Sequence, residues 1–115
     1  MLGPEIDRPH IVAGVQFYSS TEGGRHGPIF GTKVFKCVFT FHGDNFDCVL
    51  LLQNIGSIHP GQTVTVPMLF LCPDLLEGRL HPGDVFQLRE ARIIAEGKVE
   101  SVFLPNRETN SLDSE

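Results

Sequence analysis

The glycine-rich segment at residues 23–30, GGRHGPIF, holds the residues with the clearest potential for chemistry. Arg25 carries a guanidinium, whose planar fork of donors matches a phosphate, and His26 stands directly after it. Peptide N–H groups of such a loop can add further donors to an anion. The segment therefore predicts either an anion-binding loop or a turn that the fold itself requires, and the residue types alone leave both interpretations open.

Patterns that would indicate catalysis or a cofactor are missing from the sequence. It contains no GxxxxGK[ST] phosphate loop and no GxSxG serine motif, and its five histidines show neither HxH nor HExxH spacing. Asp44 and Asp47 belong to a turn-rich stretch, where a solvated edge is their expected role. We therefore predict that the protein is not an enzyme, with no catalytic residue, no metal, no cofactor and no bound nucleotide.

The charge balance bears on the choice of partner. Nine Lys and Arg against fourteen Asp and Glu give a formal net charge of −5, whereas binding to a phosphate backbone depends on clustered Lys and Arg. No apolar run approaches the roughly 20 residues of a membrane helix, and the start, MLGPEIDRPH, lacks the basic and apolar regions of a signal peptide. We expect a cytoplasmic protein with no membrane partner, for which another protein is the first candidate partner.

The cysteines give a further indication of the environment. Cys37, Cys48 and Cys72 are odd in number, show no CxxC spacing and each lie in an apolar neighbourhood. This pattern favours reduced, buried thiols over a disulfide framework or a zinc site.

Alternating apolar residues predict the strands that must position the loop. In residues 33–41, every second residue from Phe35 to Phe41 is Phe or Cys, so one face of an extended chain is apolar. Turn signals such as HGDN at 42–45 separate segments of this kind, which favours an antiparallel all-β fold. The predicted strands lie within residues 11–20, 33–41, 46–53, 62–71, 84–90 and 92–104.

The length of 115 residues suits one domain. We expect a barrel domain over residues 10–104 after a short N-terminal lead-in at residues 1–9. Residues 105–115 hold almost no apolar side chain and are predicted to form a disordered acidic tail. Within the domain, HPG at 59–61 and at 81–83 predicts two type II turns, because proline suits the second turn position and glycine the third.

The order of these features resembles the third, C-terminal domain of translation elongation factor Tu. That domain carries a glycine-glycine-arginine-histidine loop followed by a small or proline residue and paired aromatics, which GGRHGPIF matches closely. Its proline-glycine turn before a long strand is matched by residues 60–62, and its arginine-glutamate step into the last strand by residues 89–90. The likeness runs from about residue 10 to residue 103.

The resemblance implies a closed, six-stranded antiparallel β-barrel, which leaves no long strand edge bare. The alternation pattern predicts the same number of strands. In the family this domain packs against the GTPase domain and helps to hold the T-stem of aminoacyl-tRNA near the loop arginine and histidine. By this match and by their charge, the candidates for binding a partner or RNA are Gly24, Arg25, His26, Lys33, Lys36 and Arg89.

Departures from the family bear on the function. The GTPase domain and the second barrel are absent, so we expect a small stand-alone protein, and ARII at 91–94 replaces a glycine-glycine-arginine-threonine turn. The leading hypothesis is a binding module that engages a protein partner, by imitating or competing with the translation factor. The alternative is a tRNA- or RNA-binding accessory domain. Arg25 and His26 then either contact a phosphate or serve the barrel and its docking surface, and the negative charge favours the second role.

Overall fold

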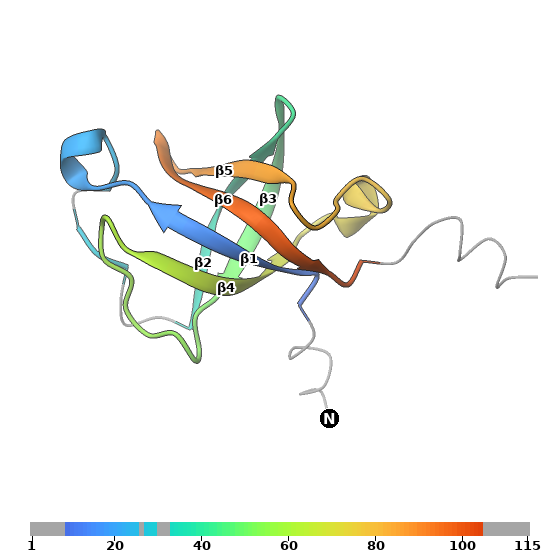
Figure 1. Cartoon of the computed structure of the whole chain (residues 1–115), viewed down its shortest axis with the longest axis horizontal. Coiled ribbons are helices and arrows are strands. Elements are labelled where there is room, and N and C mark those ends of the chain that lie inside the picture. Colours follow the sequence, from blue (N-terminus) through green and yellow to red (C-terminus); the bar gives the residue numbers. More distant parts are fainter. Residues whose placement is uncertain (1–8, 26, 30–32, 105–115) are drawn as a thin grey trace, which may run out of the picture.

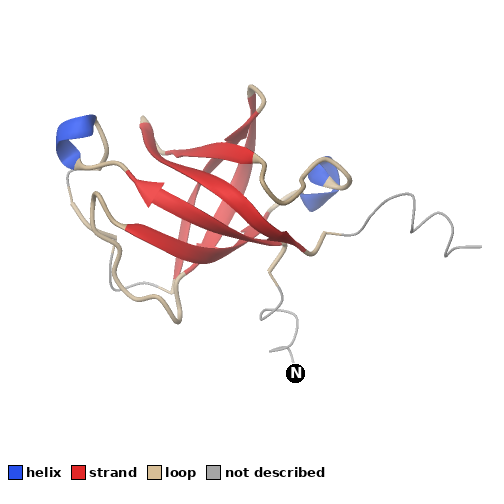
Figure 2. Cartoon of the chain, viewed as in Figure 1, coloured by secondary structure: helices blue, strands red, loops and turns tan. Residues whose placement is uncertain are grey.

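The computed structural model describes residues 9–25, 27–29 and 33–104, and in this part of the chain six strands close into an antiparallel β-barrel (Figures 1 and 2). The order around the barrel is β1-β4-β3-β2-β5-β6, and the pairing of β6 with β1 closes the barrel. The predicted all-β, six-stranded barrel is confirmed. The strands are β1 (Ile11–Phe17), β2 (Val34–Phe41), β3 (Asp44–Leu51), β4 (Thr63–Phe70), β5 (Val85–Arg89) and β6 (Ile93–Val102).

The strand bounds follow the predicted ranges closely and differ where a turn intervenes. β1 ends at Phe17, earlier than predicted, because Ser20–Glu22 forms a short 3-10 helix, η1. β3 begins at Asp44, inside the predicted turn, because His42 and Gly43 alone connect it to β2. These two residues have positive φ angles of 50° and 83°, as in a type I′ hairpin turn, whose twist matches that of the paired strands.

Inward-facing side chains of alternate strand positions fill the barrel. Residues 37, 39 and 41 of β2 are buried on one face, as the alternation predicts. Phe39 is fully buried, and its ring centroid lies 4.4 Å from that of Phe86 and 4.9 Å from that of Phe70. Because rings at these separations interact favourably beyond the area that they bury, the aromatic cluster holds strands from opposite sides of the barrel together.

The two HPG segments form the predicted turns. In residues 59–62 and 81–84 the glycine has a φ of 89° and 97°, and the fourth N–H donates to the first carbonyl at 3.0 Å in both. The side chain of the fourth residue also accepts from the first N–H, at 2.9 Å for Gln62 Oε1 and 2.8 Å for Asp84 Oδ2. Both HPG repeats are therefore turns that local hydrogen bonds stabilise.

The ladders around the barrel differ in length. β2 and β3 pair through eight residue pairs along their whole length. β2 pairs with β5 over residues 38–40 alone, and β3 pairs with β4 over residues 48–50 alone, within the described chain. Two short seams therefore flank the long β2–β3 hairpin.

The cysteines follow the prediction at two positions and depart from it at the third. Cys37 and Cys48 are buried and lie opposite each other in the β2–β3 register, with their Sγ atoms 3.6 Å apart. The hydrogen bond with Cys37 and burial both raise the pKa of the Cys48 thiol. The prediction that Cys72 is buried was wrong, since this residue is exposed. β4 ends at Phe70 and the chain enters the 3-10 helix η2 (Pro73–Leu76), so strand alternation no longer applies.

The described residues exclude most of the predicted lead-in and all of the predicted acidic tail, because residues 1–8 and 105–115 lie outside them. His26 also lies outside them. In the part of the chain that is described, no helix has the length and apolar character needed to cross a membrane.

Candidate binding surfaces

The backbone of the glycine-rich loop is fixed by the fold on both sides of Arg25. The N–H of Gly24 donates to the carbonyl of Ser19 at 3.0 Å, and Ile29 exchanges two hydrogen bonds of 2.8 Å with Ile58. Gly24 is buried, and a Cβ at this position would overlap the carbonyl of Tyr18. Glycine is therefore required here by a close backbone approach, which is a structural role.

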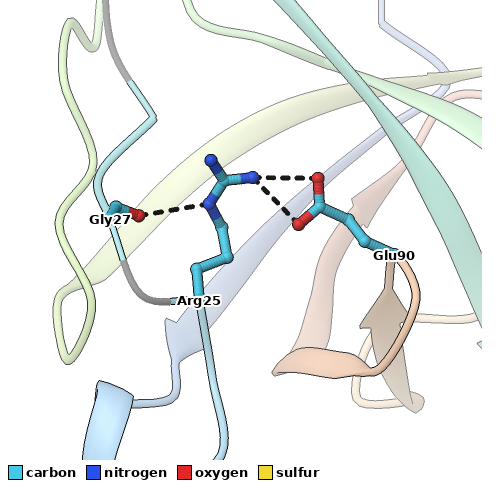
Figure 3. A network of polar contacts seen from close by, with 3 residues as sticks. All are labelled: Arg25, Gly27 and Glu90. Carbon is cyan, nitrogen blue, oxygen red and sulfur yellow. Dashed lines mark hydrogen bonds and ion pairs between the residues drawn. The ribbon is translucent and has the colours of Figure 1, made fainter.

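Arg25 places its guanidinium in a network with other residues of the barrel. Its Nη1 donates to both carboxylate oxygens of Glu90, at 2.9 and 2.8 Å, and its Nε donates to the carbonyl of Gly27 at 3.2 Å (Figure 3). The guanidinium carbon lies 5.3 Å from the centroid of the Phe35 ring, within cation–π range. These contacts clamp the loop to the connection between β5 and β6, and we call the Arg25–Glu90 pair the clamp.

A hollow of about 330 Å³ lies beside the clamp. Arg92 also lines this hollow, and its Nη1 donates to the carbonyl of Gly23 at 3.4 Å. A phosphate in this hollow would have to compete with Glu90 for Arg25, because the carboxylate already accepts two charge-assisted hydrogen bonds from it. The lining residues are Gly24, Arg25, Gly27, Glu90, Ala91, Arg92 and Ile94.

The remaining candidates from the sequence lie elsewhere on the barrel. Lys33 lines a separate, mostly apolar hollow of about 430 Å³. Lys36 is exposed on the outer face of β2, and Arg89 is half-buried at the last position of β5. Within the described chain, neither lysine lines the hollow beside Arg25. The structure therefore joins Arg25 to Glu90 and leaves Lys33 at a separate hollow. Lys36 and Arg89 lie on the outer face of the adjacent strands β2 and β5, because Arg89 pairs with Val38, one outward position from Lys36.

A second surface crosses the outside of the barrel and has no sequence motif. The register aligns one outward-facing residue of each strand with the next, from β4 through β1, β6, β5 and β2 to β3. Every member of this row has a hydrogen-bonding side chain, and Glu96 is its one charged residue. We call it the polar row, and its members are Thr63, Gln16, Glu96, Gln87, Thr40 and Asn45.

The polar row lies along a groove of about 740 Å³, which five of its six members line. Gly14 faces outward and adds no side chain to fill the groove. Gly97 faces the core, where a Cβ would overlap the Phe86 ring and would lie 2.9 Å from the carbonyl oxygen of Gly14. Gly97 therefore allows β6 to pack closely against Phe86 and β1, and Gly14 leaves the groove open. The other lining residues are His42, Gly43, Val85 and Phe86.

Glu96 occupies the centre of the groove. Its register partners are Gln16 on β1 and Gln87 on β5, so a carboxylate stands between two amides. The hydroxyl of Tyr18 donates to Glu96 Oε1 at 3.1 Å and helps to orient the carboxylate. At the hairpin end of the row, Thr40 Oγ1 donates to Asn45 Oδ1 at 2.8 Å. The groove therefore offers amide donors and acceptors around one negative charge.

Comparison with known proteins gives no relative: no family model matches the chain, and no curated protein matches it. The described residues contain no cluster of three or more His, Cys, Asp or Glu that could hold a metal ion. The resemblance to elongation factor Tu therefore depends on the loop and turn residues, and the function has to be argued from the two surfaces.

Proposed function

We propose that this protein is a non-enzymatic binding module that engages a protein partner through the groove. The observation that carries the proposal is the polar row, which presents side chains from different strands along one open space. Interfaces between proteins that associate reversibly combine apolar contacts with many hydrogen bonds and bound water. A groove with amides, hydroxyls and an exposed valine suits such an interface.

The clamp supports a protein partner over RNA. The charge of Arg25 is balanced by Glu90 inside the fold, and the chain as a whole carries a formal net charge of −5. RNA binding gains most of its affinity from counterions that available Lys and Arg release, and an arginine already paired with a carboxylate contributes less to this release. The family role of this loop at a tRNA is therefore the weaker explanation of Arg25.

The same geometry supports a binding role over a catalytic one. General acid–base chemistry uses groups whose pKa values are matched to proton transfer, commonly as a pair in different environments. Glu96 is exposed and has amides, not a second acid or base, as its register partners. Its hydrogen bond with Tyr18 favours one orientation of the carboxylate at the surface, which suits the recognition of a ligand.

Site-specific photo-crosslinking in the native host tests the proposed function. A photoreactive amino acid at Gln87 in the groove should give covalent adducts with a protein, and the same group at exposed Lys36 should not. The purified protein should bind total tRNA weakly at low salt and equally with Arg25→Ala. Adducts at both positions, or tight tRNA binding that falls with salt and with Arg25→Ala, would overturn the proposal in favour of non-specific contact or RNA binding, respectively.

A further inference from the structure

The length and chemistry of the groove indicate what kind of segment fits it. Neighbouring strands lie roughly 4.8 Å apart, so the five groove-lining members of the polar row, on five adjacent strands of the closed barrel, follow a curved path of about 19 Å along the sheet. An extended polypeptide advances about 3.3 Å per residue, so about six residues would follow the row. Glutamine amides both donate and accept, which matches the alternating N–H and C=O groups of an extended backbone.

The charges around the groove indicate which side chain of a bound segment would fit at its centre. Among the described residues, no Lys or Arg lines the groove, and Glu96 supplies its one carboxylate. Glu100 adds a second carboxylate at the border of the groove, close to Gly14. Its Oε2 lies 2.9 Å from the position that a Cβ would occupy on Gly14. Lys98 stands between Glu96 and Glu100 on the outer face of β6 and is the positive group nearest in sequence. The centre of the groove is therefore complementary to a cation.

The apolar lining favours a cation on a long aliphatic stem. Val85 is 64% exposed beside the groove, and its register partner on β6 is Lys98, one outward position from Glu96. Lysine and arginine side chains cover apolar surface with their methylene groups while their charged ends reach a polar partner. A small inorganic cation would use Glu96 and leave Val85 without contact.

We propose, on the basis of the proposed function, that the groove binds an extended polypeptide segment whose lysine or arginine side chain is seated on Glu96 between Gln16 and Gln87. The guanidinium or ammonium donates to the carboxylate that Tyr18 holds in place. The two glutamines and the threonines at either side hydrogen-bond to the backbone of the segment. Because Gly14 has no side chain, the backbone of the bound segment can approach the sheet at this position.

Selection from a random octapeptide display library tests the inference. Wild-type protein should enrich peptides with Lys or Arg at one fixed position, and a selected peptide made synthetically should lose roughly tenfold or more in affinity for Glu96→Gln, because a charge-assisted hydrogen bond is removed. Asp47→Asn is the matched control, since it removes a carboxylate from an exposed position on β3 outside the groove lining. Its affinity for the same peptide should equal that of the wild type.

The outcomes separate this inference from the proposed function. Peptides that bind with no basic residue at a fixed position, and that are lost with Gln87→Ala but kept with Glu96→Gln, would refute the seated cation while leaving the groove as the interface. Peptides whose affinity changes with neither substitution would refute both. Thermal unfolding of each variant shows that the fold is retained, which is expected because both side chains lie at the surface.

Discussion

The clamp and the polar row both place polar side chains at the barrel surface, and they use them in opposite ways. In the clamp, Arg25 donates to Glu90 and to Gly27, so the polar groups satisfy one another within the fold. In the polar row, Glu96 and its neighbouring amides line an open groove. The described polar groups of the loop with a recognisable motif are therefore engaged within the fold, whereas those of the surface with no motif line an open space.

The largest expected effects come from one glycine in each region. Gly24→Ala would drive a Cβ into the Tyr18 carbonyl, and Gly97→Ala would drive one into the Phe86 ring, which is itself packed on Phe39. Each should lower the free energy of unfolding by about 1–3 kcal/mol, as overpacking does. Chemical denaturation measures this loss.

Two further glycines are the matched controls for these substitutions. A Cβ at Gly27 would meet no atom within 4 Å, and a Cβ at Gly14 would meet the flexible carboxylate of Glu100. Gly27→Ala and Gly14→Ala should therefore change the free energy of unfolding by about 0.5 kcal/mol or less. Equal losses for all four variants would show that close packing is not what distinguishes Gly24 and Gly97.

An intermediate effect is expected from the clamp. Arg25→Ala should cost about 1 kcal/mol of stability, because the side chain is partly exposed and loses an ion pair, a hydrogen bond to Gly27 and its contact with Phe35. A double-mutant cycle with Glu90→Gln should give a favourable coupling energy that falls as salt is added. Zero coupling at low salt would mean that Arg25 is not held by Glu90 and would restore it as a candidate for a phosphate.

The smallest effect on stability is expected from the polar row. Glu96→Gln keeps an oxygen that can accept from Tyr18, and Gln87→Ala removes an amide from a half-buried outer position. Both should leave the free energy of unfolding within about 0.5 kcal/mol of the wild type. A larger loss in either variant, measured by the same denaturation, would mean that the row supports the fold, and the contrast with the clamp would disappear.

The sequence predicted the elements and not the contacts between distant ones. Strand positions and the two HPG turns could be predicted because alternation and turn chemistry are local. Arg25 could be singled out, but its partner Glu90 lies 65 residues away. The polar row was missed altogether, because Gln16 and Glu96 become neighbours only when β1 and β6 close the barrel. The available signal was a run of Gln, Thr and Glu at outward strand positions, whose register the sequence does not give.

The two short seams beside the β2–β3 hairpin set how the barrel opens. Backbone amides exchange with deuterium when local hydrogen bonds break, and a ladder of three residue pairs breaks more readily than a long one. The hairpin should therefore separate from β4 and β5 as a unit, with faster exchange along both seams than along the β1–β6 ladder. Thr40 and Gln87 face each other across one seam, so each opening divides the polar row. A segment that spans the groove would bridge this seam and slow its exchange, which makes deuterium uptake between β2 and β5 a direct report of occupancy.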